Sequence, residues 1–366
     1  MSRDLKEAIA MRHLWTNRKF YLGLFSSVVF LTLALQQVDW ARTAATLQRA
    51  NWLLALLGIG AAVATLVTFA FRWRVLLSST AALSVKDTFS FIMIGYLANT
   101  FFPLRMGEIA RAVLLGRRHG IRASVVFGSV VLERTLDVLT VLIIALGISF
   151  VMTIPAAIRA GMMTLAGVGL LALATLLVLA RSGNRVLGLV EMLPGFVSRL
   201  LVERLARVVA RFADGLAALR HGRELWSVLC LSALAWAIAG TATICYIAAF
   251  HLHAPWYAGF FVLTVTNLGS AIPSSPGFIG VYHYLAVLAL SVWVPDKSEA
   301  LAYAIGTHGI SVLLNILLGC MCLAREGIAL QSISATGEIG QEPIAAQKKD
   351  GNSLLLSKAS LSDGHH

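Results

Sequence analysis

The chain has 366 residues, of which 58% are hydrophobic and 13% carry a charged side chain. A soluble globular domain carries about 25% charged residues, so this composition excludes an ordinary soluble protein and indicates an all-α polytopic membrane protein. The net charge is +12, and because the basic residues lie between apolar runs, they predict membrane topology and contact with anionic headgroups rather than nucleic-acid binding.

The N-terminal region predicts two crossings. Residues 1–19 are basic and are expected in the cytoplasm, and the apolar run at 20–36 lacks a cleavage site, so we expect it to remain as an anchor rather than a removed signal peptide. Residues 40–52 are amphipathic and carry tryptophans, which favours a position on the membrane surface. A second span is predicted at 52–71. The basic residues that follow it are interpreted as cytoplasmic markers: Arg72, Arg74 and Lys86.

The next apolar run, residues 88–104, has basic flanks on both sides. If it crossed the membrane, the densest basic loop would face outside, against the positive-inside rule. The run has only about 17 residues, and it contains Asn99 and Pro103, which suit a broken helix. We therefore predict a re-entrant hairpin that returns to the cytoplasmic side. The arginines after the run are Arg105, Arg111, Arg117, Arg118 and Arg122.

The middle of the chain predicts two further spans and a surface segment. Residues 123–152 form a long apolar run that is expected to end outside, and residues 160–180 return inward. Residues 181–224 combine many arginines with apolar residues at helical spacing, which predicts a basic amphipathic helix on the cytoplasmic leaflet. A linker helix packed on the protein is the alternative.

The C-terminal half predicts a span at 225–250 and a last span at 300–324, with a broken segment between them. Residues 257–294 are interrupted by IPSSPGFIG at 272–280, whose prolines and glycines are incompatible with a straight helix. Residues 325–366 are polar and predict a disordered cytoplasmic tail. The sequence thus predicts about six full spans and two broken hairpins, within a membrane domain at 20–324.

The two broken segments share a pattern. Each has an asparagine upstream of Pro-x3-Gly and lies between two predicted spans. By the predicted topology, the two span–hairpin–span units point in opposite directions through the membrane. This predicts an inverted repeat of the kind that transporters use for alternating access, with two unrelated kinks as the alternative. The residues expected to break the helices are Pro103, Gly107, Pro273, Pro276, Gly277 and Gly280.

Charged residues inside the run at 123–152 point to a binding site. Glu133 and Asp137 are separated by four positions and Arg134 lies between them, so all three belong to one helix. Each costs roughly 2.5–3.5 kcal/mol at a helix centre in a membrane, so we expect protein partners beside the first hairpin. Arginine can hold a phosphate with two hydrogen bonds, which predicts a headgroup site; a purely structural salt-bridge network is the alternative. The expected partners at the hairpin mouth are Arg105, Glu108 and Arg111.

The second hairpin offers fewer chemical groups. Ser274, Ser275 and the backbone near Gly277 are expected to present donors to an anion, whereas His283 either senses protons or is an ordinary interior histidine. The pair His251-x-His253 and the four cysteines do not predict a metal site or a cofactor. No catalytic triad, zinc-protease motif or phosphate-binding loop is present, so the sequence indicates neither an enzyme nor an ATP-driven pump.

Three motifs in order carry a family resemblance. They are N-x3-P-x-R-x-G-E-x2-R from Asn99 to Arg111, E-R-x2-D at 133–137, and PSSPGFIG at 273–280. Across about residues 15–325 the chain resembles the lysylphosphatidylglycerol synthase transmembrane-region family. The resemblance implies translocation of an aminoacylated phospholipid, a polyprenyl-linked glycan or a hopanoid-type lipid. It also places His283 near a position where the family often has glutamate, and the short polar tail implies that this chain lacks the aminoacyl-transfer domain.

The leading hypothesis is a lipid flippase in a bacterial-type inner membrane, with both termini cytoplasmic and membrane lipids as its partners. The alternatives are a non-transporting partner of a lipid- or envelope-modifying enzyme and, more weakly, a solute or ion carrier. The lipid, the direction and energy source of transport, and the oligomeric state stay open. The predicted substrate-binding residues are Asn99, Arg105, Glu108, Arg111, Glu133, Arg134, Asp137, Asn267, Ser274, Ser275 and His283.

Overall fold

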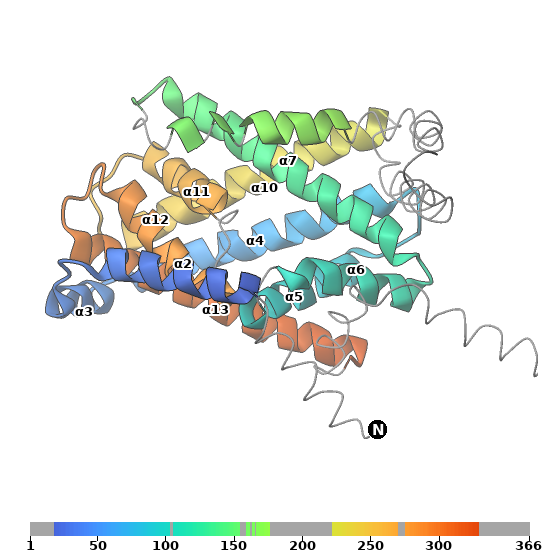
Figure 1. Cartoon of the computed structure of the whole chain (residues 1–366), viewed down its shortest axis with the longest axis horizontal. Helices are drawn as coiled ribbons and strands as arrows, with labels where there is room; N and C mark the ends of the chain where they lie inside the picture. Colours follow the sequence, from blue (N-terminus) through green and yellow to red (C-terminus); the bar gives the residue numbers. More distant parts are fainter. Residues whose placement is uncertain are drawn as a thin grey trace, which may run out of the picture.

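The computed structural model describes residues 18–102, 105–153, 159–161, 163–164, 166–175, 222–269 and 275–328. Every regular element in this part of the chain is helical, which confirms the all-α prediction (Figure 1). Three of its helices are long and apolar enough to cross a membrane: α4 (Trp52–Leu77), α10 (Gly222–Ala249) and α13 (Lys297–Glu326). The chain is therefore a multi-pass membrane protein. The N-terminus, most of the predicted basic segment at 181–224 and the tail beyond 328 lie outside the described residues.

The predicted number of six full spans is not confirmed. Counting α2 (Arg18–Leu35) together with α3 (Trp40–Gln48) as one bent span raises the number in the described residues to four. Helix α7 (Ala123–Ser149) has 27 residues and a length of about 40 Å, but its three charged residues make it less apolar than a simple span. Of the span predicted at 160–180, the described part is helical within Arg159–Thr175, and the residues beyond 175 lie outside the described ranges.

Helix α3 turns away from α2 by 87° and is anchored at the start of α13. Asp39 caps α3, because its carboxylate accepts hydrogen bonds from the backbone amides of Ala41 and Arg42. Arg42 lies 2.8 Å from Asp296, and the Asp39 amide donates to Ser298 Oγ at 3.0 Å. The amphipathic segment predicted at 40–52 is thus a short helix tied to the protein, followed directly by α4.

The first predicted hairpin is present as two antiparallel helices, α5 (Val85–Phe101) and α6 (Met106–His119). Near the tip, the Gly107 amide donates to Asn99 Oδ1 at 2.8 Å, and at the open end the Phe91 ring lies 6.3 Å from the His119 ring. Gly107, which was expected to break the helix, lies instead in the first turn of α6. A Cβ there would collide with the Gly95 carbonyl, so this glycine permits the close approach of the two helices. Pro103, which was expected to break the helix, lies outside the described residues.

The second hairpin consists of α11 (Tyr257–Gly269), the 3-10 turn η2 (Pro276–Phe278) and α12 (Val281–Leu290). Its helical limbs of 13 and 10 residues are too short to cross about 30 Å of hydrocarbon. Gly277 and Gly280 have φ values of 69° and 90°, which favour glycine, and they produce the turn into α12. Pro273 and Ser274 lie outside the described residues.

The two hairpins belong to two corresponding units, in each of which a long helix is followed by a hairpin and another long helix. Helices α4 and α10 pack antiparallel: the Asn51 amide donates to the Ala249 carbonyl at one end, and Arg72 donates to Ser232 Oγ at the other. The last helix of each unit contacts the hairpin of the other, α13 against α5 and α7 against α11. The α5–α6 and α11–α12 hairpins lie toward opposite ends of the molecule (Figure 1).

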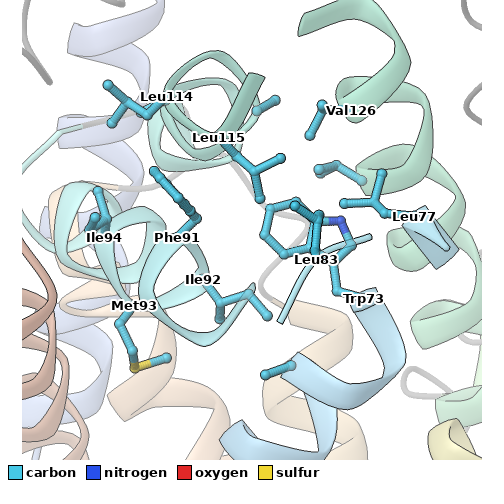
Figure 2. Packing of buried hydrophobic residues seen from close by; sticks show 14 of the residues in the cluster. Trp73, Leu77, Leu83, Phe91, Ile92, Met93, Ile94, Leu114, Leu115 and Val126 are labelled. Atoms are coloured by element: carbon cyan, nitrogen blue, oxygen red, sulfur yellow. The ribbon is translucent and has the colours of Figure 1, made fainter. Parts of the chain in front are cut away.

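The helices pack around two hydrophobic cores, and each core includes residues from both units. Figure 2 shows Trp73 of α4, Phe91 of α5 and Leu115 of α6 converging in the first core, and these side chains are fully buried. The second core joins α10 to α11, α12 and α13 around Phe261 and Tyr303. The helices of both hairpins contribute to these cores, so their described limbs are packed against protein.

Candidate functional site

A buried charged cluster lies between α4, α6 and α7. Arg72 is 0% exposed, and its Nη1 lies 2.6 Å from Asp137 Oδ1 while its Nη2 lies 3.6 Å from Glu133 Oε1. Arg111 is 1% exposed, and its Nη2 lies 3.2 Å from the same Glu133 oxygen. Trp236 adds a hydrogen bond from Nε1 to Asp137 at 3.1 Å. The acidic residues of α7 therefore have buried partners from three other helices.

Arg72 corrects the sequence interpretation. It was expected to follow the second span as a cytoplasmic marker, but α4 continues to Leu77 and carries Arg72 into the core. The positive-inside rule concerns loops, and it misassigned this residue because the carboxylates that compensate its charge are more than 60 positions away in the chain. The sequence did contain a sign that another cation is buried here. Two carboxylates predicted inside a membrane helix require more positive charge than one neighbouring arginine provides.

Arg111 also differs from its predicted place at the mouth of the hairpin. Its guanidinium lies 4.7 Å from the centre of the Trp73 ring and is enclosed by the core. The reason is helical periodicity: Arg111 lies on the buried face of α6, together with Ala110 and Leu114, whereas Glu108 lies on a half-exposed face. Arg111 is thus a partner of Glu133 rather than a group at the entrance.

Arg134 links this buried cluster to a more open region. Its Nη2 lies 3.1 Å from Glu133 Oε1, and its Nε lies 3.2 Å from Glu108 Oε1. Arg105 approaches the same Glu108 oxygen at 3.7 Å. The Arg134 and Arg105 side chains keep 30% and 34% of their surface exposed, so the network runs from a closed interior to two accessible guanidinium groups.

These accessible groups line a cavity of about 300 Å³ at the point where the two hairpin tips meet. Helix α5 contacts η2 directly, and the Arg105 guanidinium lies 5.5 Å from the centre of the Phe278 ring. Arg105 itself has a left-handed backbone conformation with φ of 56°, at the turn between α5 and α6. The charged lining residues are Arg105, Glu108 and Arg134, and the carboxamides are Asn99, Asn267 and Asn315.

Helix α13 contributes a histidine that sequence reasoning missed. His308 lines the cavity, its Nε2 lies 2.8 Å from the Gly277 carbonyl oxygen, and its ring stacks on Tyr282 at 5.0 Å. The predicted His283 lies behind it, buried, with its ring 4.8 Å from that of His308. His283 Nδ1 accepts a 3.4 Å hydrogen bond from the Gly280 amide and is not among the residues lining the cavity.

Of the predicted anion donors of the second hairpin, Gly277 lines the cavity, Ser275 does not, and Ser274 lies outside the described residues. The Ser275 amide donates to Ser27 Oγ of α2 at 2.8 Å, and the Ser275 side chain is not part of the lining. Asn99 and Asn267 do line the cavity, one from each hairpin. The described residues hold no group of three or more His, Cys, Asp or Glu side chains suited to a metal ion.

Comparison with known proteins identifies the family to which this chain is similar. The family described as the lysylphosphatidylglycerol synthase TM region matches residues 20–319. Glycosyltransferase AglD from Haloferax volcanii is 25% identical over 269 residues, which is 65% of this chain and 43% of AglD. The chain thus spans less than half the length of this curated relative, and no solved structure matches it. With two hairpins meeting at one polar cavity and a match over nearly all of its membrane portion, the chain belongs to the lysylphosphatidylglycerol synthase TM region family.

Proposed function

We propose that this protein is a flippase-like translocase that moves an anionic or modified lipid between the two leaflets of the membrane. The observation that carries the proposal is the cavity between the hairpin tips, where two accessible guanidinium groups lie among the helices of the bundle. Charged residues at such a depth are costly and mark substrate pathways in membrane proteins. A phosphate-bearing headgroup is the ligand that paired arginines bind best.

The arrangement of the two units supports alternating access. Helices α4 and α10 run antiparallel, and the contacts that link α13 to α5 correspond to those that link α7 to α11. We interpret the units as an inverted repeat, in which the hairpins enter from opposite leaflets. Rocking of one unit against the other then exposes the cavity to each leaflet in turn.

Within this proposal the charged residues have two roles: some contact the lipid phosphate, and the others hold these residues in position. Arg105 and Arg134 contact the phosphate, and Glu108 orients both guanidinium groups before the lipid arrives. Arg72 and Arg111 hold Glu133 and Asp137, and so fix the position of α7 and of Arg134 on it. The cavity is the size of a headgroup, at the low end of the about 300–1,000 Å³ of small-molecule sites, so the acyl chains remain in the bilayer.

We place the protein in an inner, plasma-type membrane with both termini in the cytoplasm. The end of the molecule that holds Lys86, Arg118 and Arg325 is rich in basic residues. The positive-inside rule assigns this end to the cytoplasm.

A proteoliposome assay tests the proposal. Fluorescent phosphatidylglycerol, aminoacylated and polyprenyl-phosphate lipids are placed in both leaflets, and dithionite quenching measures their exchange. We expect the protein to accelerate exchange of at least one lipid, and Arg134→Gln to slow it about tenfold, because a charge-assisted hydrogen bond contributes about 1.5–3 kcal/mol.

The matched control is Arg117→Gln, which removes an exposed arginine of α6 that does not line the cavity. This variant should exchange lipid at the wild-type rate. Exchange by the wild-type protein at the rate of protein-free vesicles, for all three lipids, would refute the transport function.

The second candidate is a non-transporting membrane partner of a lipid- or glycan-modifying enzyme. It is favoured by the relative AglD, which is named a glycosyltransferase and of which this chain matches 43%. Lipid binding without leaflet exchange in the same vesicles would support this candidate over the translocase.

A further inference from the structure

The charged groups that line the cavity are two arginines and one glutamate, so positive charge exceeds negative charge. Among the described residues that form the lining, Glu108 is the one carboxylate, and it faces two guanidinium groups. Its Oε1 atom lies 3.2 Å from Arg134 Nε and 3.7 Å from Arg105 Nη1. Arg134 also approaches Glu133 and Asp137, which are paired with Arg72 and Arg111. Within the described part of the chain, the connected network thus joins four guanidinium groups to three carboxylates, which leaves a net positive charge.

The other acidic residues nearby do not face the cavity. Glu133 and Asp137 are 1% and 7% exposed, are absent from the lining, and are paired with Arg72, Arg111 and Arg134. The two undescribed stretches next to the hairpin tips, 103–104 and 270–274, contain no acidic residue in the sequence. Among the described residues, a positively charged headgroup thus finds no carboxylate at the cavity that is not shared with an arginine.

The rest of the lining is neutral and rich in hydrogen-bonding groups. Asn99, Asn267 and Asn315 provide carboxamides from α5, α11 and α13, and Thr100, Thr266 and Ser311 provide hydroxyl groups. The three hydroxyls donate to backbone carbonyls of their own helices, so toward a ligand they act as acceptors. The carboxamide NH2 groups of Asn99 and Asn315 can donate, and the hydroxyl groups of glycerol or a sugar pair with both kinds of group. Such a lining offers both donors and acceptors to the hydroxyl groups of a polyol, whereas a ring of groups with one charge offers only one of the two.

We propose that the cavity selects a lipid phosphate whose attached group is neutral and carries hydroxyls, such as glycerol or a sugar, and discriminates against headgroups with an ammonium. This inference rests on the proposed function, whose substrate class it narrows. The phosphate lies against Arg105 and Arg134, and the polyol lies among the asparagines. A lysyl or ethanolamine group would place its ammonium beside two guanidinium groups of the same charge, and like charges repel.

Direct binding tests the selectivity without transport. The purified full-length protein in detergent is titrated with short-chain phosphatidylglycerol, phosphatidylinositol, phosphatidylethanolamine and lysyl-phosphatidylglycerol, and Kd is measured by native mass spectrometry. Phosphatidylglycerol and phosphatidylinositol are expected to bind at least tenfold more tightly than the two lipids with an ammonium. Equal or tighter binding of lysyl-phosphatidylglycerol would overturn the proposal.

A further arm separates a lipid headgroup from a free phosphate ester of the same chemistry. Soluble glycerol phosphate is added as a competitor, and it should bind much more weakly than phosphatidylglycerol because it lacks acyl chains. Equal affinities would assign the site to a soluble phosphate ester and overturn the lipid assignment.

Adding a carboxylate should reverse the selectivity. Asn315→Asp is expected to shift the ratio of the two Kd values toward lysyl-phosphatidylglycerol by at least tenfold. Asn99→Asp is a second variant with the same expected shift, and it retains the oxygen that accepts from the Gly107 amide. The control is Asn51→Asp at the start of α4, away from the cavity, where aspartate caps a helix as well as asparagine does. An unchanged ratio in both cavity variants would refute the proposed placement of the headgroup.

The two proposals fail separately. Selective binding of phosphatidylglycerol without leaflet exchange would leave the selectivity intact and refute transport. Leaflet exchange of lysyl-phosphatidylglycerol at the rate of phosphatidylglycerol, by a protein that binds both equally, would leave transport intact and refute the selectivity.

Discussion

Four arginines have two different roles, and the extent of burial of each side chain distinguishes the two pairs. Arg72 and Arg111 are 0% and 1% exposed and hold the carboxylates of α7, whereas Arg105 and Arg134 reach the cavity. The buried pair is the costlier one, because each guanidinium has lost its water and depends on Glu133 and Asp137 for compensation. The position of Arg134 at the cavity thus depends indirectly on Arg72 and Arg111, which hold the carboxylates that Arg134 contacts.

Removing the buried cation tests this dependence. Arg72→Met should lower the unfolding free energy by about 3–5 kcal/mol, because it leaves buried carboxylates without their partner. Thermal unfolding in detergent measures the change. Arg117→Met, at an exposed position on α6, is the matched control and should unfold like the wild type.

The double variant Arg72→Met with Asp137→Leu distinguishes charge imbalance from loss of packing. It should recover part of the stability, since an apolar pair of similar volume replaces an ion pair at little cost. A double variant less stable than Arg72→Met alone would contradict this account.

At the scale of elements, the hairpins are held together by close helix contacts rather than by length. Helices α5 and α6 meet where Gly95 and Gly107 face each other, and the Asn99 side chain closes the contact by accepting from the Gly107 amide. Two short helices in a membrane associate when small residues let their backbones approach and when polar side chains bond across them. The same hairpin places Arg105 and Glu108 at the cavity.

Adding one methyl group at this contact should separate the helices. In Gly107→Ala the new Cβ would collide with the Gly95 carbonyl and the Asn99 side chain, so we expect a loss of about 1–3 kcal/mol in stability and weaker lipid binding. Gly60→Ala in α4 makes the same chemical change where a Cβ has open space. Thermal unfolding of the control should match or slightly exceed the wild type, because alanine favours helix.

At the scale of the whole molecule, helix α13 connects two distinct ends. Its last turn approaches the beginning of α5 and the end of α6, through Arg325 to the Lys86 carbonyl at 3.1 Å and Arg118 to Glu326 at 3.7 Å. Its first residue, Lys297, bonds to Gln37 at the far end, between α2 and α3. Both ends of the α5–α6 hairpin therefore lie on one side of the molecule.

Labelling with single cysteines tests this topology in intact vesicles. In a chain whose four cysteines are replaced by serine, Lys86→Cys and Arg118→Cys should react with an impermeant maleimide from the same side, and Lys297→Cys from the opposite side. All three positions are exposed, so access does not depend on unfolding. Labelling of positions 86 and 118 from opposite sides would mean that this segment crosses the membrane, and the inverted repeat would be lost with it.

Several features of the fold follow from local patterns alone. The all-α class follows from the long apolar runs, and the turn in the second hairpin follows from glycines with positive φ at 277 and 280. The cost of charge in a membrane also predicted that Glu133 and Arg134 would have partners in the first hairpin, and Arg111 and Glu108 fill these places. The role of these residues in lipid binding stays a proposal.

The sequence by itself thus determined the class of the fold, the breaks in the two hairpins and the family, because each depends on the identity and spacing of neighbouring residues. Tertiary structure alone decided which charges are buried and which face the cavity. In the structure Arg72 and Arg111 lie in the core, where the sequence did not predict them. His308 lines the cavity, and Ser275 does not. The physical reason is that burial and charge compensation depend on helices distant in sequence, as the pairing of Arg72 in α4 with Asp137 in α7 shows.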